Sequence, residues 1–299
     1  MFVVVGAAGK VGYSTSSALR KAGVPVRAVL RDESKAGRLA AIGCDIALAD
    51  LQDPAALGRA IANADAVQII LPPPPKAEDA AGEMRRSIES LADALERAHP
   101  KRVLAISDYG AHVGHDVGMP SVFRIFEQRL RRLKMSKVIL RSAEHMEGWG
   151  ASIPMAVATG VLPSLHHPVE RMFPAVSAPD VGLIAADLLL HASEADEQVV
   201  HAEGPRRYSA VDVAAVLSQL LGRPVAAQPV PRSQWQPSLE QVLSASATKL
   251  LVDVYDAHNR GGLVDVEPNG KVRYGTSEFV DALLPLVAAV EGTNRKAAR

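Results

Sequence analysis

The sequence predicts an α/β fold with a doubly wound parallel sheet, joined to a smaller, mostly helical subdomain. Three observations predict it: short apolar runs alternate with helical patterns, a glycine turn follows the first run, and the alternation loosens after residue 142. Strands separated by helices of about 10 to 15 residues form βαβ crossovers, which place the strands in parallel and helices on both faces. The length of 299 residues suits one large α/β domain with a smaller companion.

The first half of the chain supplies most of the alternation. Gly23 and Pro25 end the first helix, and Pro72 to Pro75 close the fourth strand as a rigid loop, because proline can continue neither element. The polar, glycine-rich residues 108–118 are expected to form a loop at the carboxyl end of the fifth strand. Strands are expected at 2–5, 26–30, 44–48, 66–71, 102–107 and 137–141, and helices at 11–22, 34–42, 54–62, 78–98 and 122–133.

The second half is less regular. Asp180 is expected to cap a helix, and Ser209 with Asp212 forms a variant of the capping box. We expect a partly irregular segment up to residue 170, a turn at 231–237 and a frayed basic end at 293–299. Further strands are expected at 171–176 and 198–202, and further helices at 180–191, 209–222, 239–258 and 277–290.

Composition excludes several classes of function. Lys+Arg and Asp+Glu both number 33, so the net charge is zero and there is no basic field to attract nucleic acid or an anionic membrane. No apolar run reaches the roughly 18 residues that span a bilayer, and no basic segment precedes the first apolar residues. The single cysteine, Cys44, lies in an apolar strand and is expected to be buried rather than nucleophilic. We therefore expect a cytoplasmic protein without nucleic-acid or membrane partners.

The pattern Gly6-x-x-Gly9-x-x-Gly12 is the strongest functional signal. It follows a strand, precedes a helix and opens a series of βαβ units, as in the Rossmann-type dinucleotide-binding fold. The first glycine permits a tight turn, the second lets the backbone approach a pyrophosphate, and the third lets helix and strand pack closely. The sequence therefore predicts a dinucleotide-binding Rossmann domain over residues 1–150 and a substrate-side region over residues 151–299, whose strands and helices interleave with the same sheet.

The end of the second strand indicates which dinucleotide is bound. Arg31 stands where NAD-preferring proteins place an acid, and Lys35 follows, with Asp32 between them. A guanidinium suits a 2′-phosphate, so NADP(H) is favoured over NAD(H); the alternative is a solvated surface pair. Asp50, followed by Leu51, either lies beside the adenine or only caps the next segment.

Catalytic residues are less evident. Ser107 and Tyr109 end the fifth strand, but Val113 stands where a lysine would lower the pKa of the tyrosine, so Tyr109 is a weak acid. His112, His115 and His145 have better intrinsic pKa values for proton transfer, although each could be only a loop residue. No His-Glu-x-x-His helix or cysteine cluster is present, so no metal site is expected from the His112 and His115 pair or from His166-His167.

Several segments together carry a family resemblance: Val5–Gly12, Val29–Arg31, Ala49–Leu51, the strand that contains Ser107, Val138–Arg141, Ser177–Val181 and Tyr208–Val225. They look like the NmrA-like group of atypical short-chain dehydrogenases, and most like its NAD(P)H-dependent quinone reductases and triphenylmethane-dye reductases. The resemblance implies a Rossmann domain that binds NADP, with a C-terminal part that closes over the nicotinamide.

The resemblance also implies roles for individual residues. Those that would hold the pyrophosphate and adenosine are Gly6, Ala8, Gly9, Lys10, Val11, Arg31 and Asp50. Leu71, Pro72 and Ser107 would lie near the ribose and nicotinamide. Residues from Arg141 to Met146, including His145, would border the substrate pocket, with Tyr109 and Trp149 as walls.

Two departures from the group limit the reaction. The group often has an aromatic pair where this chain has Glu144-His145, and Phe123 stands near the place of the lysine that ether reductases use. Ether or isoflavone reduction is therefore not expected. The absent Tyr-x-x-x-Lys pair also argues against an epimerase or hydroxy-compound dehydrogenase of the extended type.

Two hypotheses about function stay open. The first is a reductase that transfers hydride from NADPH to a small aromatic or quinone-like acceptor, in which solvent protonates the product. The alternative is a non-catalytic NADP(H) sensor that acts through a protein partner. A homodimer is compatible with both.

Overall fold

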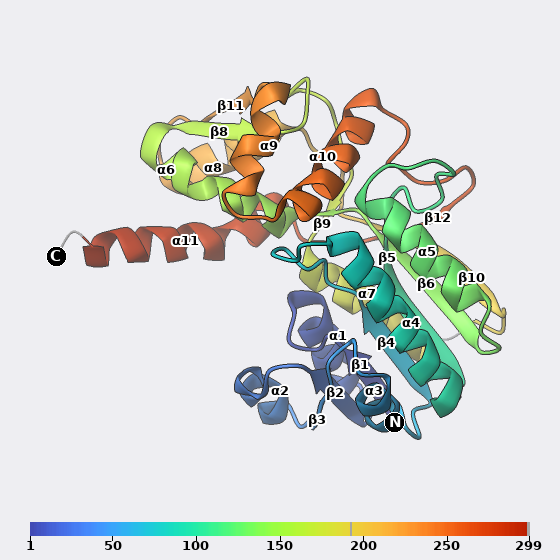
Figure 1. Ribbon diagram of the computed structural model, residues 1–299. Helices are drawn as coiled ribbons and strands as arrows, with labels where there is room; N and C mark the ends of the chain where they lie inside the picture. Colours follow the sequence, from blue (N-terminus) through green and yellow to red (C-terminus); the bar gives the residue numbers. More distant parts are fainter. Residues whose placement is uncertain (192, 298–299) are drawn as a thin grey trace.

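The computed structural model describes residues 1–191 and 193–297, and within them eight strands form one parallel sheet (Figure 1). The strand order is β12-β10-β6-β5-β4-β1-β2-β3. The order runs outward in both directions from the neighbours β1 and β4, and ligands of doubly wound sheets bind outside the carboxyl ends of the strands at this switch point. The predicted fold class is confirmed.

The first half of the chain alternates strand and helix as predicted. Its strands are β1 (Phe2–Val5), β2 (Val26–Leu30), β3 (Asp45–Leu48), β4 (Ala66–Ile70), β5 (Arg102–Asp108) and β6 (Ser136–Ser142). Its helices are α1 (Lys10–Lys21), α2 (Gly37–Ala41), α3 (Pro54–Ile61), α4 (Ala80–Ala98) and α5 (Met119–Arg131), with a 3₁₀ helix, η1 (Glu33–Lys35), between β2 and α2.

Helices cover both faces of the sheet. Successive side chains of a strand point to opposite faces, so Val3 and Val4 belong to different core clusters. The cluster of Val4 contains residues of α1, α2 and α7 (Ala178–Leu190), whereas that of Val3 contains residues of α3, α4 and α5. Both valines are fully buried, as expected for a parallel strand with helices on each side. Helices α1 and α7 lie so close together that the Thr15 hydroxyl donates a hydrogen bond to the Gly182 carbonyl, at 3.1 Å.

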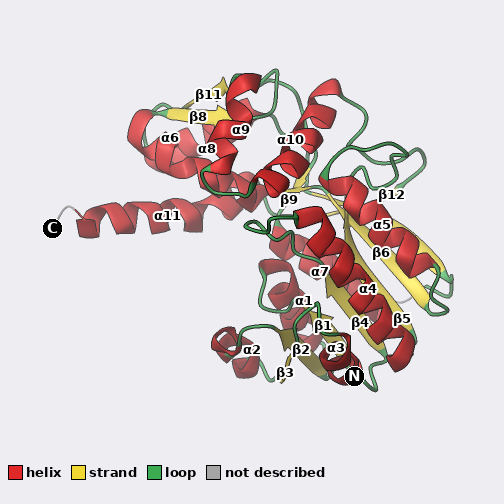
Figure 2. Cartoon of the chain, in the orientation of Figure 1, coloured by secondary structure: helices red, strands yellow, loops and turns green. Residues whose placement is uncertain are grey.

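The second half supplies two strands of the sheet and a helical subdomain. Strands β10 (Glu197–Glu203) and β12 (Lys271–Tyr274) extend the sheet beyond β6. The subdomain lies over the carboxyl edge of the sheet (Figure 2), and α11 (Phe279–Ala297) projects from it toward the C-terminus. Its other elements are β7 (Glu144–His145), η2 (Met146–Ser152), α6 (Ile153–Thr159), β8 (Val161–Ser164), β9 (Ala175–Val176), α8 (Ala210–Leu221), β11 (Ala226–Pro229), α9 (Arg232–Glu240) and α10 (Ala245–Arg260).

Several predicted elements of the second half are wrong. Residues 231–237 are not a turn but begin α9, because Trp235 is buried and its indole N–H donates to the Val230 carbonyl at 2.8 Å. The single helix expected at 239–258 is divided, since α9 ends at Glu240 and Ser244 caps the start of α10. Within the predicted strand 171–176 only β9 is regular, because Pro174 lacks the N–H that a ladder needs.

Other differences concern the sheet edge and the last helix. Strand β12 was not predicted, since it is a short and mostly exposed edge strand without an apolar run. Asp180 does not cap α7; its carboxylate accepts the backbone N–H groups of Thr276 and Ser277 at 2.8 Å, and Ser177 is the N-cap residue. The end expected to be frayed is helical as far as Ala297, and residues 298 and 299 lie outside the described residues.

Candidate active site

The glycine turn after β1 has the geometry that the pattern predicts. Gly6 has a φ of +84°, a conformation that favours glycine, and a Cβ at Gly12 would lie 2.5 Å from the Gly6 carbonyl oxygen. A Cβ at Gly9 would meet only the Gly6 oxygen, at 3.6 Å, so open space lies over this part of the turn. Gly6 and Gly12 are thus required by packing, whereas Gly9 leaves room for a ligand.

The amino end of α1 suits a pyrophosphate. Its N-cap residue is Gly9, no side chain caps the first turn, and that turn contains no acidic residue. The first helical hydrogen bond runs from the Tyr13 N–H to the Gly9 carbonyl at 2.9 Å, so the N–H groups of Lys10, Val11 and Gly12 precede the helical ladder. Uncapped N–H groups and the positive end of the helix dipole favour an anion there.

Three basic side chains follow the end of β2. Arg31 is exposed, and the Lys35 ammonium lies 4.0 Å from Asp32. Asp32 is engaged locally, because its carboxylate accepts the Ser34 backbone N–H at 3.0 Å and the Ser34 hydroxyl at 2.7 Å. Asp32 therefore serves as a cap for η1.

Arg38 of α2 is the third base, and it was not predicted. Its guanidinium donates a hydrogen bond to the Ala8 carbonyl and lies over the Tyr13 ring, 4.3 Å from the centroid. These contacts place a positive charge directly at the glycine turn. The sequence indicated it only by its position in the same segment as Arg31, between β2 and β3. Such a short segment has no hydrophobic period from which the direction of a side chain could be inferred.

Asp50 and Leu51 have structural roles at the end of β3. The Asp50 carboxylate accepts the Gln52 N–H at 2.8 Å, whereas Asp53 caps α3 through the N–H groups of Ala55 and Ala56. Leu51 packs against the core beneath α3 and α4. This geometry fits the capping alternative for Asp50 and leaves its exposed carboxylate at the carboxyl edge of the sheet.

Leu71 and Pro72 extend β4 beyond its last ladder residue. Leu71 is buried and Pro72 is exposed. The proline loop also supports the subdomain, because the Ser244 N–H at the start of α10 donates to the Pro75 carbonyl at 2.8 Å. The loop thus connects the carboxyl edge of the sheet to the subdomain above it.

A buried ionic network contains Ser107 and Arg141. The Ser107 hydroxyl donates to Glu127 at 2.6 Å, and two guanidinium nitrogens of Arg141 donate to both Glu127 oxygens at 2.9 and 2.8 Å. Arg141 also forms an ion pair with Glu267 at 3.0 Å and is only 3% exposed. Ser107 and Arg141 are therefore both bonded to Glu127, and both side chains are buried away from an acceptor.

Tyr109 and His112 are poor proton donors in this structure. Tyr109 is 1% exposed, and its hydroxyl donates to Glu203 at 3.2 Å. Burial and then the Glu203 charge raise the pKa of Tyr109 well above its usual range. Burial and then the Arg141 charge lower the pKa of His112, which keeps its ring neutral near pH 7.

His145 lies on the glycine-turn side of the site. It is half-buried, and its Nε2 lies 3.0 Å from the Ser142 hydroxyl. Burial lowers the pKa of His145, nearby Glu147 and Glu144 oppose this, and the Lys10 ammonium lowers the pKa further.

Met146 and Trp149 belong to the core of the subdomain. Met146 is fully buried, and Trp149 stacks with Phe173 and His166 at centroid distances of 5.8 Å. Their side chains therefore shape the wall of the subdomain from its interior. Exposure of either side chain to an acceptor would require a rearrangement of this stack.

The structure gathers further titratable groups that the sequence did not indicate. Glu144 accepts hydrogen bonds from His166 Nε2 at 2.9 Å and from the Tyr255 hydroxyl at 3.3 Å. The charge of Glu144 contributes to a raised pKa of Asp108, the last residue of β5. These residues come from four separate segments, so no local spacing could have related them.

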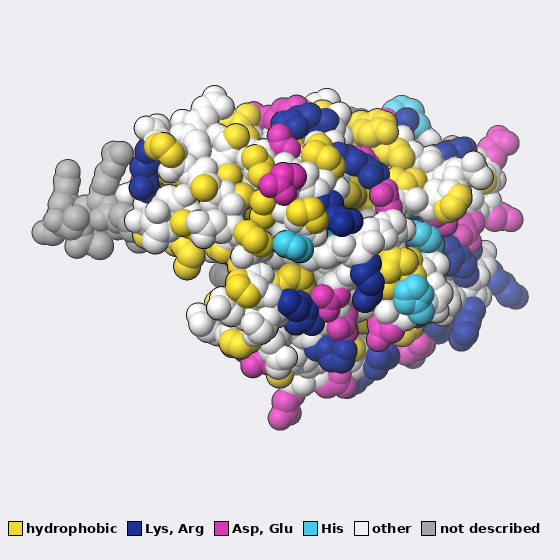
Figure 3. Space-filling view, turned by 90° about the horizontal axis from the view of Figure 1, so that it is seen from above, with side chains coloured by type: hydrophobic (Ala, Val, Ile, Leu, Met, Phe, Trp, Pro, Cys, Tyr) yellow, Lys and Arg dark blue, Asp and Glu magenta, His cyan; other side chains and the backbone are white. Residues whose placement is uncertain are grey.

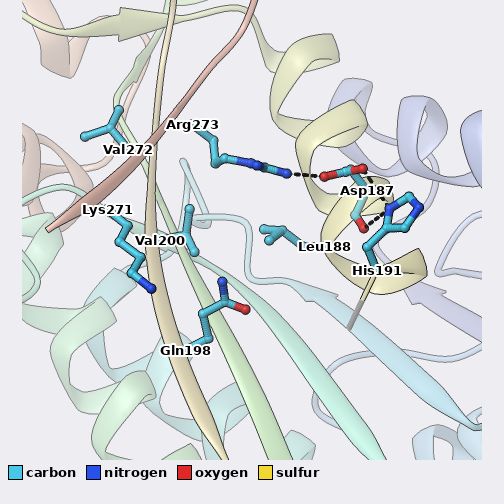
Figure 4. Close-up of a pocket in the computed structure, with 8 residues that line it drawn as sticks. All are labelled: Asp187, Leu188, His191, Gln198, Val200, Lys271, Val272 and Arg273. Atoms are coloured by element: carbon cyan, nitrogen blue, oxygen red, sulfur yellow. Dashed lines mark hydrogen bonds and ion pairs between the residues drawn. The ribbon is translucent and has the colours of Figure 1, made fainter. Parts of the chain in front are cut away.

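One hollow in the described part of the chain lies away from this edge. It has a volume of about 600 Å³ and lies where α7, β10 and β12 meet at the amino edge of the sheet (Figure 4). Asp187 bonds Arg273 and His191 on one side of it, and Lys271 and Gln198 lie on the other. It is therefore separate from the glycine turn.

Two further observations bear on possible ligands. Among residues 1–191 and 193–297, no three His, Cys, Asp or Glu side chains come together as metal ligands, and no helix of that part is long and apolar enough to cross a membrane. On the face shown in Figure 3, positive and negative side chains are interspersed. The surface there has no single-sign field of the kind that attracts a polyanion.

The fold and the glycine turn define a dinucleotide-binding protein of the doubly wound class. Residues 6–145 match the family described as NAD(P)H-binding. The chain is 26% identical over 226 residues to the NAD(P)H azoreductase of Xenophilus azovorans, an alignment that covers 75% of each protein.

Two solved structures share the fold over nearly the whole chain. The NADPH-dependent quinone oxidoreductase QOR2 from Escherichia coli, complexed with NADPH, matches with a TM-score of 0.75 and 23% identity, covering 98% of this chain and 99% of that one. The triphenylmethane reductase of Citrobacter sp. matches with a TM-score of 0.78 and 20% identity, covering 96% and 99%. Residues 6–145 thus match an NAD(P)H-binding domain, and nearly the whole chain shares the fold of these two reductases.

Proposed function

We propose that this protein is an NADPH-dependent reductase whose acceptor is a flat, electron-poor aromatic compound such as a quinone or a dye. The observation that carries the proposal is the uncapped, acid-free amino end of α1 within an NAD(P)H-binding domain. The names of the relatives support the acceptor class, since they comprise an azoreductase, a quinone oxidoreductase and a triphenylmethane reductase. When bound, NADPH supplies the hydride.

The preference for NADP(H) over NAD(H) rests on Arg31, Lys35 and Arg38. A 2′-phosphate can form charge-assisted hydrogen bonds with guanidinium groups, each worth about 1.5–3 kcal/mol. The neighbouring acid, Asp32, is already engaged by Ser34. The positive charge at the end of β2 is thus available for a phosphate.

The remaining residues of the proposed site have distinct roles. The backbone of Gly9, Lys10 and Val11 binds the pyrophosphate, together with the turn at Gly6 and Ala8. Asp50, Leu71 and Pro72 line the carboxyl edge where ribose and bases lie. His145 borders the acceptor, whereas Ser107, Tyr109, Arg141, Met146 and Trp149 hold the wall behind it.

The cofactor preference is tested by binding of NADPH and NADH, measured by calorimetry. Arg31→Ala, at the exposed end of β2, is expected to weaken NADPH binding about 10- to 100-fold and to leave NADH binding within about twofold, because only NADPH carries the 2′-phosphate. Arg86→Ala, at an exposed position of α4, is the matched control and should change neither. Equal binding of both dinucleotides by the wild type would refute the preference.

The reaction is tested by NADPH oxidation with a panel of quinones, azo dyes and triphenylmethane dyes. Oxidation above background with at least one acceptor is expected. No oxidation with any acceptor, combined with tight NADPH binding, would refute the reductase and favour the sensor hypothesis. A sensor must also bind NADPH and NADP+ with different affinities, since equal affinities shift no equilibrium.

A further inference from the structure

Asp108 lies where the nicotinamide half of a dinucleotide belongs. It is the last residue of β5, and β5 is separated from β1 only by β4. Neighbouring strands are about 4.8 Å apart, and the register places Ala105 level with Val5, the last residue of β1. Asp108 lies three residues farther along β5, so it is about 14 Å from the end of β1, where the glycine turn begins. A dinucleotide crosses the sheet at the switch point with its pyrophosphate at that turn, so its second half extends over β4 and β5.

The strand register connects Asp108 to the glycine turn. Asp108 lies opposite Ser142 of β6, and the Ser142 hydroxyl lies 3.0 Å from His145 Nε2. His145 in turn lies within the electrostatic influence of Lys10 at the start of α1. Asp108, Ser142 and His145 therefore lie together at the carboxyl ends of β5 and β6.

The surroundings of Asp108 favour its neutral form. The carboxyl is half-buried, and among the described residues no side chain donates a hydrogen bond to it or forms an ion pair with it. Burial raises the pKa of Asp108 to about 7, the Tyr109 backbone N–H opposes this, and the charges of Glu144 on β7 and Glu127 on α5 add to the rise. Asp108 is thus expected to be mostly protonated below about pH 7.

Glu144 has the opposite environment. Burial acts to raise its pKa, but the charge and hydrogen bond of His166, the charge of His258 and the hydroxyl of Tyr255 outweigh burial and lower it. Two neighbouring carboxyl groups whose environments move their pKa values apart are the usual arrangement of an acid beside a permanent anion. Here the anion is Glu144 and the acid is Asp108.

We propose that Asp108 is the proton donor to the acceptor oxygen, with Glu144 as the positioning residue that keeps Asp108 protonated. This inference rests on the proposed reductase function. Hydride from NADPH brings two electrons to a quinone, and the resulting oxyanion takes the proton of the Asp108 carboxyl as the carboxyl O–H bond breaks and the hydroquinone O–H bond forms. The Asp108 carboxylate then regains a proton from solvent, so the products are NADP+ and hydroquinone.

The choice of acceptor separates this role from a structural one. A quinone needs a proton after hydride transfer, whereas a triphenylmethane dye cation becomes a neutral product by accepting hydride alone. At pH 6, Asp108→Asn is therefore expected to reduce kcat/KM for a quinone about 100-fold, within the usual range for loss of a general acid, and to leave dye reduction within about threefold. Asp93→Asn on the exposed face of α4 is the matched control and should change neither.

The pH dependence provides a second measurement. In the wild type, kcat/KM for the quinone should fall above about pH 7, and Glu144→Gln should move this fall to lower pH, because removal of the neighbouring charge lowers the pKa of Asp108. Asp108→Glu, which keeps a carboxyl, should retain a pH-dependent fall. Equal loss with quinone and dye, or an unchanged rate and pH profile in Asp108→Asn, would overturn the proposal.

A titration without cofactor distinguishes failure of the donor from failure of the reductase. The Asp108 carboxyl carbon, assigned by its absence from the Asp108→Asn spectrum, should titrate near pH 7 in carbon-13 NMR of the free protein. If it titrates below pH 5, the proposal is wrong whether or not the protein reduces any acceptor. If the Asp108 carboxyl titrates near pH 7 but the wild type reduces neither acceptor, the proposed reductase function is wrong. The proposed role of Asp108 as proton donor is then wrong as well.

Discussion

Glu127→Gln tests the buried network that supports the carboxyl edge of β5 and β6. Glu127 is fully buried and accepts hydrogen bonds from Ser107 and from two nitrogens of Arg141 at 2.6 to 2.9 Å, with a longer contact from Arg131 at 3.3 Å. Glutamine replaces one acceptor oxygen by an NH2 group that faces guanidinium donors. Removal of one partner of a buried ion pair costs about 3–5 kcal/mol, and the lower value applies here because Glu267 still pairs with Arg141.

The expected loss is large enough to measure in several ways. About 3 kcal/mol corresponds to a melting temperature roughly 6 °C lower, at about 2 °C per kcal/mol for a chain of this length. Glu89→Gln is the matched control, because Glu89 also pairs with an arginine, Arg129, but its side chain is 62% exposed. An exposed ion pair contributes less than about 1 kcal/mol, so this control should unfold nearly as the wild type does.

The pH dependence of the same loss has a definite sign. Burial acts to raise the pKa of Glu127, but Arg141 and Ser107 outweigh it and hold the pKa below its usual range. A carboxyl with a lowered folded-state pKa contributes stability above the ordinary carboxyl range and loses it as the pH falls. The difference between wild type and Glu127→Gln in urea unfolding should therefore shrink below about pH 4.5, and a loss under about 1 kcal/mol at pH 7 would refute the reasoning.

Three other substitutions follow from the structure. Gly12→Ala should weaken NADPH binding at least tenfold and lower the melting temperature, because its Cβ would lie 2.5 Å from the Gly6 carbonyl oxygen. Unchanged binding in calorimetry would contradict this close approach of residue 12 to the Gly6 carbonyl. Asp108→Asn should raise the free energy of unfolding relative to wild type by up to about 4 kcal/mol at pH 9 and by little at pH 4. The reason is that a pKa raised from 3.8 to about 7 stabilises the fold only while the group is protonated. Equal effects at both pH values in urea unfolding would exclude the raised pKa. Leu283→Ala should lower the free energy of unfolding by about 2–5 kcal/mol in the same assay, whereas Leu284→Ala, at its exposed neighbour, should lower it by under about 0.5 kcal/mol. Similar losses for both would contradict the burial of Leu283 on α11.

The sequence predicted local features well where one physical rule applied. The glycine turn, the first six strands and the Ser209 capping box all formed, because turn, period and cap depend on residues a few positions apart. The turn expected around Trp235 was wrong, because the burial of one large side chain outweighed two prolines. The missed strand β12 lacks an apolar run, since an exposed edge strand needs none.

Site residues divide in the same way. The glycine pattern could be interpreted from its position after β1, and the NAD(P)H-binding match over residues 6–145 agrees with that interpretation. The role of Arg31 at the end of β2 stays a prediction. The surroundings of Arg141 could not be predicted from its strand, because Glu127 approaches it from α5 and Glu267 from the segment before β12. The same applies to Glu144, whose partners His166 and Tyr255 are held by the subdomain.

The sequence by itself determined that this chain forms a doubly wound sheet with a dinucleotide turn at its start. Those properties follow from hydrophobic period and from the conformational freedom of glycine, which act within a few residues. Only the tertiary structure decided which carboxyl keeps a proton, because burial and the charge of a neighbour depend on which segments pack together. Asp108 is an ordinary acid in the sequence, and its place beside Glu144 at the carboxyl edge makes it the residue on which the proposed chemistry depends.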